Sequence, residues 1–161
     1  MASLTPHHED PLPDAHAPAE EEGEICAICL ETLPRWASRG FVRFECCGKG
    51  MHRECEVQLN MSACSQNCPM CRAPAAGSDE EQHKRCLRWA KKGKAWAMDS
   101  VGSNFHSGLG VSESKEMARL WFEKSAEQGY PKAQHNLGTM HAMGEGGPVS
   151  KEKARLWYEK A

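Results

Sequence analysis

The spacing of hydrophobic and polar residues predicts two different kinds of structure along the chain. Residues 41–46 alternate between apolar and polar side chains, which predicts a short strand, and residues 54–61 have the spacing of a helix. The sequence Ser78-Asp-Glu-Glu81 is a capping box and predicts the start of another helix. From there to residue 161 we expect a helical and repetitive structure.

The helical segment repeats itself with a period of 36 residues. Gly102 recurs as Gly138, and the stretch Ala118-Arg-Leu-Trp121 recurs as Ala154-Arg-Leu-Trp157. Such a period predicts stacked helix pairs. The expected units are a half unit at 79–94, a full unit at 95–131 and a partial unit at 132–161. The expected helices lie near 95–106, 113–128 and 133–143 and from about 150, with glycine-rich turns at Gly108-Leu-Gly-Val and Gly144-Glu-Gly-Gly-Pro.

The period, the glycines and the A-x-x-W motif resemble the Sel-one-like repeat, a relative of the tetratricopeptide repeat. This resemblance implies an all-α solenoid with a concave surface that binds peptides or other proteins. Trp89, Trp96 and His135 are candidates for that surface, although residues at helical spacing belong more often to a core. The last unit stops in mid-pattern, so we expect a fragment or a partial array.

Composition changes the interpretation of the residues before the repeats. Eight of the nine cysteines lie between positions 26 and 71. The start of the chain has no signal-peptide pattern, and no apolar run reaches the roughly 18–20 residues of a membrane span. We therefore expect a cytoplasmic or nuclear protein without membrane contact, and the net charge of −2 gives no indication of nucleic-acid binding. In a reducing compartment, clustered cysteines indicate metal more often than disulfides.

The spacing of these cysteines is typical of zinc ligands. Cys26-Ala-Ile-Cys29 and Cys68-Pro-Met-Cys71 are two C-x-x-C pairs, and His52-Arg-Glu-Cys55 lies between them. Zinc takes four thiolate or imidazole ligands in a tetrahedron. A segment this short cannot bury a self-sufficient core, whereas structural zinc supplies about 10–16 kcal/mol of apparent binding energy per site. Cys86 lies outside the cluster and is expected to be a small buried residue.

The stretches CAICLE, CCGKGMHREC and CPMCR resemble a RING finger. The resemblance implies a small α+β module with two zinc ions in a cross-brace. The implied ligands are Cys26, Cys29, His52 and Cys55 for the first ion, and Cys68 and Cys71 with Cys46 and Cys47 for the second.

The second ligand pair departs from the RING pattern. Lys49 stands where the family has a histidine, and a protonated lysine is a poor ligand. Cys46 and Cys47 together are the favoured replacement, and Cys64 is the competing fourth ligand. The CCGK stretch also resembles a RING-like module found beside Sel-one-like repeats in algal and other protist proteins.

The RING resemblance implies a ubiquitin ligase that works without a covalent intermediate. Such a protein docks a ubiquitin-conjugating enzyme and positions its ubiquitin thioester for attack. The matching positions are Ile28 and Pro69 as docking contacts and Arg72 as the linchpin cation. The alternative is a zinc-stabilised interaction scaffold without transfer activity, and a peptide-reader module is less favoured still. The repeats, with no nucleophile–base set, are expected to bind an unknown protein partner.

These patterns predict three regions. Residues 1–24 are acidic, rich in proline and free of aromatic residues, which predicts a disordered tail. Residues 25–74 form the predicted RING-type module, and residues 75–161 form the predicted helical repeats.

Overall fold

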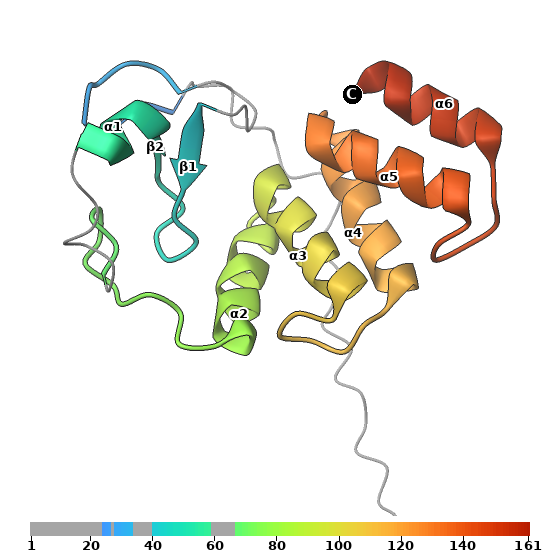
Figure 1. The fold of residues 1–161 in the computed structure, drawn as a ribbon, viewed down its shortest axis with the longest axis horizontal. Coiled ribbons are helices and arrows are strands. Elements are labelled where there is room, and N and C mark those ends of the chain that lie inside the picture. Colours follow the sequence, from blue (N-terminus) through green and yellow to red (C-terminus); the bar gives the residue numbers. More distant parts are fainter. Residues whose placement is uncertain (1–23, 27, 34–39, 59–66) are drawn as a thin grey trace, which may run out of the picture.

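The chain folds into a small cysteine-bearing module followed by a stack of helices (Figure 1). The computed structural model describes residues 24–26, 28–33, 40–58 and 67–161. The predicted tail lies outside the described residues except for Glu24, and Cys64 lies outside them too. Among the described residues, no helix combines the length and the apolar character needed to cross a bilayer.

The cysteine-bearing module contains a two-stranded antiparallel sheet and one short helix. Strand β1 (Phe41–Arg43) pairs with β2 (Gly50–His52), and helix α1 (Arg53–Gln58) follows directly. The buried residues of its core are Cys26, Leu33, Phe41, Met51 and Cys55. Because two of these are cysteines, the described part of the module has only three other buried hydrophobic side chains in its core.

The first predicted strand is shorter in the structure than the alternation of residues 41–46 suggests. β1 ends at Arg43, because the chain turns at Phe44. The Phe44 carbonyl accepts a 2.7 Å hydrogen bond from Gly48, which has a φ of 72° that favours glycine. We call residues 44–49 the β1–β2 turn. The helix predicted at 54–61 begins at Arg53 and is described as far as Gln58.

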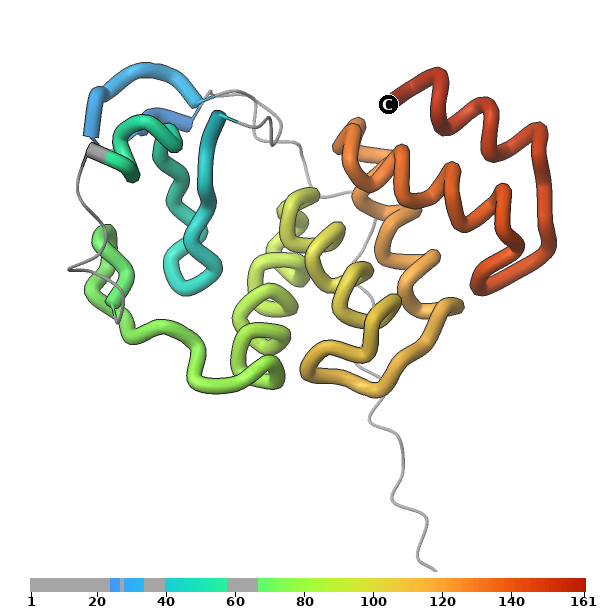
Figure 2. The backbone as a smooth tube through the Cα atoms, in the orientation of Figure 1, coloured from blue at the N-terminus to red at the C-terminus, as the bar shows by residue number. Residues whose placement is uncertain are grey.

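Five helices make up the rest of the described chain, and each lies beside the next along the stack (Figure 2). They are α2 (Asp79–Ala90), α3 (Ala95–Ser107), α4 (Lys115–Glu127), α5 (Pro131–Met143) and α6 (Lys151–Lys160). The serines that cap α2, α4 and α6 are Ser78, Ser114 and Ser150, and each hydroxyl accepts a backbone N–H from the first turn. Their spacing of 36 residues confirms the helical repeat that the sequence predicts.

Helix α4 joins the two hydrophobic cores of the stack. Trp121 packs into the core formed with α2 and α3, and its neighbour Phe122 packs into the core formed with α3 and α5. Gly102 of α3 allows the close approach, since a Cβ there would lie 2.8 Å from the Phe122 ring. Gly138 has the same relation to Tyr158 one period later, again at 2.8 Å.

The glycine-rich turn between α3 and α4 locks one repeat onto the previous one. Gly108 and Gly110 both have a φ of 69°. A Cβ on Gly110 would lie 2.1 Å from the carbonyl oxygen of Asp79, whereas the nearest atom to a Cβ on Gly108 is 3.5 Å away. The turn therefore rests on the backbone at the start of α2, and only Gly110 makes that contact.

This difference gives a matched pair of variants for the stability of the repeats. Gly108→Ala carries only the cost of a left-handed non-glycine residue, and should lower the free energy of unfolding by about 1–2 kcal/mol. Gly110→Ala has the same φ and must also push the turn away from α2, so its loss should be clearly larger. Urea denaturation followed by far-UV circular dichroism measures both. Equal losses in the two variants would contradict the proposed role of the turn contact.

Candidate metal centres

The two C-x-x-C pairs are closed by the same hydrogen bond and by the same backbone conformation at the residue that follows the second cysteine. Leu30 donates its N–H to the Cys26 carbonyl at 3.0 Å, and Arg72 donates to the Cys68 carbonyl at 2.8 Å. Leu30 and Arg72 both have a φ of 61°, an uncommon conformation for residues with a side chain. In each turn the hydrogen bond and the left-handed residue reverse the chain after the second cysteine, and the two thiols of the pair lie in the same cluster.

The first cluster contains Cys26, Cys29, His52 and Cys55. The first pair comes from the N-terminal turn, His52 ends β2 and Cys55 lies in α1. The ligand atoms of all four residues lie within 4.8 Å of one another, and Cys29 Sγ is 3.2 Å from His52 Nδ1. Three thiols and an imidazole therefore surround one point.

The second cluster contains Cys46, Cys47, Cys68 and Cys71, again with all four sulfurs within 4.8 Å. The β1–β2 turn supplies the first two, and the second C-x-x-C turn supplies the others. Cys71 Sγ lies 3.5 Å from Cys46 Sγ, and Cys47 Sγ lies 3.9 Å from Cys68 Sγ. The competing ligand of the sequence analysis, Cys64, lies outside the described residues.

These distances fit a tetrahedral zinc site. Four sulfurs bound to one zinc ion at about 2.3 Å lie roughly 3.8 Å from one another. The sulfur pairs of the second cluster, at 3.5 and 3.9 Å, bracket that value. All the thiols that the structure describes are free, so disulfides do not compete for these sulfurs.

Each cluster holds one thiol that deprotonates readily and one that does not. Burial raises the pKa of Cys26, but backbone N–H groups near Cys29 and His52 outweigh it and lower the pKa to about 6. Burial raises the pKa of Cys55 to about 11. In the second cluster the backbone N–H of Ala73 lowers the pKa of Cys71 to about 7, whereas burial raises the pKa of Cys46. A cation is needed before all the thiols of one cluster can ionise together.

The structure places the histidine substitute Lys49 outside the second cluster. Its side chain is exposed at the end of the β1–β2 turn. Its backbone contributes instead, because a hydrogen bond from the Lys49 backbone opposes the rise that burial causes in the Cys47 pKa. Cys47 takes part in the cluster together with its neighbour Cys46.

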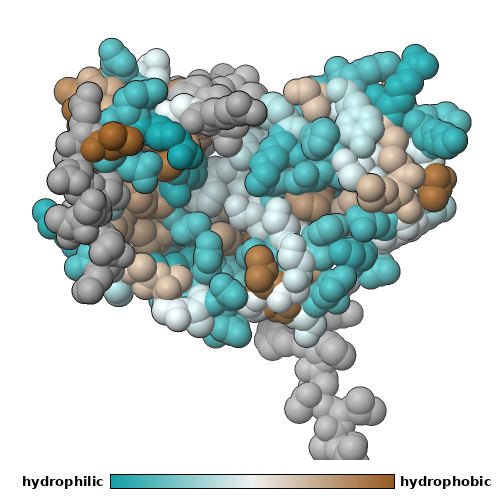
Figure 3. Space-filling view, in the orientation of Figure 1, coloured by the Kyte–Doolittle hydropathy of each residue, from teal (hydrophilic) through white to brown (hydrophobic). Residues whose placement is uncertain are grey.

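The three predicted docking residues lie on the two C-x-x-C turns. Ile28 is 42% exposed, and Arg72 is exposed at the left-handed position that closes the second turn. Pro69 is partly buried and lines a groove with Glu45 and Gln82, between the second cluster and α2. Leu30, which sequence reasoning missed, is 74% exposed at the corresponding position of the first turn. Figure 3 shows small hydrophobic patches among hydrophilic residues on one face of the molecule.

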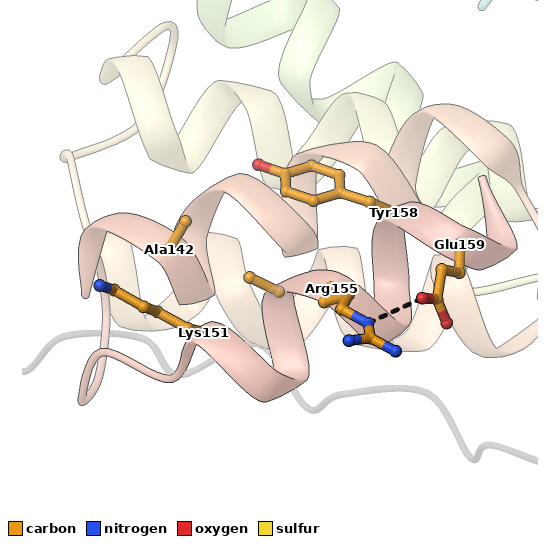
Figure 4. A pocket seen from close by; sticks show the side chains of 6 residues that line it. Ala142, Lys151, Arg155, Tyr158 and Glu159 are labelled. Atoms are coloured by element: carbon orange, nitrogen blue, oxygen red, sulfur yellow. Dashed lines mark hydrogen bonds and ion pairs between the residues drawn. The ribbon is translucent and has the colours of Figure 1, made fainter.

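Two hollows on the surface of the helical stack lie near the predicted partner surface. One, between α5 and α6, is lined by Ala142 and Tyr158 and by Arg155 and Glu159 of α6, which form a 2.8 Å ion pair (Figure 4). The other lies between α3 and α5, where His106 Nε2 pairs with Glu145 Oε2 at 2.8 Å and His135 contributes to the wall. Trp89 and Trp96 pack against each other with their ring centroids 6.3 Å apart, and neither residue lines these two hollows.

Comparison with known proteins bears on the helical part. Residues 97–130 and 131–161 match the family model of the Sel1 repeat. No curated protein matches the chain significantly.

Two solved structures share the helical arrangement. One is a Sel1 repeat protein from Oxalobacter formigenes, with 34% identity, a TM-score of 0.50, and coverage of 52% of this chain and 33% of that one. The other is c5321, a protective antigen of uropathogenic Escherichia coli that displays an SLR fold, with 26% identity, a TM-score of 0.52, and coverage of 66% of this chain and 22% of that one. This chain therefore spans a third or less of their lengths. The resemblance to Sel-one-like repeats is thus confirmed for residues 97–161, which contain Sel1 repeats.

Proposed function

We propose that the chain is a zinc-binding RING-type protein whose repeats bind a protein partner. The observation that carries this proposal is the interleaving of the two clusters. Along the chain the ligand pairs alternate between the first cluster and the second, so that each cluster joins segments on either side of the other. This alternation supports the cross-brace that the RING resemblance implies.

Two zinc ions would have a structural role in such a module. The first would be held by Cys26, Cys29, His52 and Cys55, and the second by Cys46, Cys47, Cys68 and Cys71. Zinc supplies a positive charge and four directed bonds. The protein would position the ligands. The two C-x-x-C turns and the β1–β2 turn hold the thiols, and the left-handed Leu30 and Arg72 end the two C-x-x-C turns.

The proposed activity is that of a ubiquitin ligase without a covalent intermediate. Ile28 and Pro69 would contact a ubiquitin-conjugating enzyme through apolar surface. Arg72 would bridge that enzyme and its ubiquitin, because an exposed guanidinium offers several donors at once. The rate would come from holding the thioester in a reactive geometry.

The Sel1 repeats would bind the partner or substrate. Stacked helix pairs of this kind bind peptides and proteins along their surface. The hollow between α3 and α5 offers an apolar floor at Phe122 and Met140 and polar groups at its rim. One chain would then bind both the partner, in this hollow, and the conjugating enzyme, on the cysteine-bearing module.

One observation favours a second function, a zinc-stabilised scaffold without transfer activity. The second cluster is built from adjacent cysteines, while the exposed Lys49 replaces the histidine of the RING pattern. These departures lie in the β1–β2 turn near Pro69, which lines the same groove as Cys46. A module with an altered docking face would keep its zinc and still join partners through the repeats.

The zinc content of the purified protein tests the ligand sets. We expect two zinc ions per chain in the wild type, and one in Cys46→Ser and in Cys47→Ser. Cys64→Ser should keep two, as should the control Cys86→Ala, whose thiol is buried away from both clusters. Elemental analysis of dialysed protein gives these numbers. One ion in Cys64→Ser and two in Cys46→Ser would assign the fourth ligand to Cys64 instead.

An autoubiquitination assay with a panel of conjugating enzymes tests the ligase. The wild type should form ubiquitin conjugates, and Arg72→Ala should lower the rate at least tenfold while keeping both zinc ions. The matched control is Arg155→Ala, because Arg155 is also exposed but lies on α6. A folded, zinc-loaded wild type that is inactive with every enzyme of the panel would favour the scaffold.

A further inference from the structure

Among the described residues, α2 packs against α3 but has no counterpart of the helix that precedes α4. Ser78, Ser114 and Ser150 cap α2, α4 and α6 at intervals of 36 residues, so α2 corresponds to α4 and α6. Helix α4 packs against α3 before it and α5 after it, and α6 packs against α5. The period would place the preceding partner of α2 at residues 59–71, yet the described residues 67–74 form the second C-x-x-C turn instead.

The β1–β2 turn covers this side of α2. Trp89 Nε1 donates a 2.8 Å hydrogen bond to the Glu45 carbonyl, and Arg88 Nη2 donates one of 2.8 Å to the Cys46 carbonyl. The indole also lies against Gly48, where a Cβ would be 2.8 Å from the ring. Gln82 adds a 3.3 Å contact to the Glu45 carboxylate. Figure 1 shows α2 beside this end of the module.

The same position of the repeat makes an equivalent bond one period later. Ser125 is 36 residues after Trp89, and its hydroxyl donates a 2.8 Å hydrogen bond to the carbonyl of Ala95, the first residue of α3. At both positions, a side chain of α2 or α4 donates a hydrogen bond to a backbone carbonyl of the element that precedes that helix. Trp89 is the larger donor, and it reaches a turn of the cysteine-bearing module where Ser125 reaches a helix.

The turn that α2 holds is the one that carries two thiols of the second cluster. Glu45 and Cys46 are the residues whose carbonyls are tied to α2, and Gly48 directly follows Cys47. Within the module, the turn is fixed by the hydrogen bonds of Phe44 with Gly48 and Lys49 and by a 2.7 Å bond from Arg43 to the Gly48 carbonyl. The first cluster has no such contact with a helix of the stack among the described residues.

We propose that Trp89 and Arg88 are positioning residues for the second metal site, so that metal binding there and the packing of α2 stabilise each other. This inference rests on the proposed zinc ligands and adds residues from the Sel1-repeat side. Groups that orient metal ligands from outside the ligand shell typically change metal affinity by about 10–100-fold. The effect is reciprocal by thermodynamic linkage. If the contacts of α2 raise the metal affinity, metal binding stabilises the packing of α2 by the same free energy.

Cobalt(II) is the probe that separates the two sites. A site of four thiolates and a site of three thiolates and one imidazole give different visible spectra, so titration of the full chain with cobalt(II) and then zinc yields an affinity for each. Trp89→Phe removes the N–H and should weaken the four-thiolate site at least tenfold while leaving the other within twofold. Arg88→Gln should weaken the same site alone. Since Arg88 is exposed, this variant tests the idea even where Trp89→Phe folds poorly.

Hydrogen exchange supplies the reciprocal measurement. Adding the second equivalent of metal should slow exchange of the α2 amides and leave α6 unchanged. Arg155→Gln is the control variant for both measurements. Unchanged affinity at the four-thiolate site in both Trp89→Phe and Arg88→Gln would overturn the inference, even where the repeats melt earlier. A wild type that binds no cobalt at that site would refute the proposed zinc ligands and, with them, this inference.

Discussion

The crowding of thiols around two points is the constraint on which the first half of this protein depends. Among the described residues its hydrophobic core holds five buried side chains, two of them cysteines of the first cluster. Four thiols within 4.8 Å of one another cannot ionise together at low cost, because neighbouring thiolates repel and buried thiols resist ionisation. A cation at each point would turn this repulsion into four attractive bonds, which is why zinc is central to the proposed function.

The helical half obeys a different constraint. Its cores are continuous through α4, where Trp121 and Phe122 face opposite neighbours. Glycines set the spacing: Gly102 admits the Phe122 ring, and Gly110 rests on the backbone of Asp79. These contacts recur at Gly138 and Gly146, so each repeat is locked onto the one before it by the same means. The same side-chain and glycine contacts therefore hold successive repeats of this half together.

The sequence predicted features that depend on residue spacing along the chain, and it did not predict features that depend on contacts between residues far apart in the sequence. The 36-residue period predicted the helices, and the cysteine spacing identified the candidate ligands. Their division into two groups came from the RING resemblance. The end of β1 at Arg43 was not predictable, because alternation continues to Cys46 while the turn depends on Gly48. The left-handed Leu30 and Arg72 also leave no trace in composition. Trp89 suggested a partner surface or a core, whereas its contact with Glu45 joins residues 44 positions apart.

The direct contact between α2 and the β1–β2 turn bears on how the two proposed binding activities combine. A flexible linker would let the module and the repeats move independently, and any lysine of a bound partner would then be within reach. Here Arg85 donates to the Pro74 carbonyl and Trp89 to the Glu45 carbonyl, so the connection after the module is itself pinned to α2. A conjugating enzyme docked on the C-x-x-C turns would therefore face a partner on the repeats at a fixed distance and angle. Under the proposed function, such a geometry would favour modification of a particular site on the partner, and the second metal site would help to set the angle.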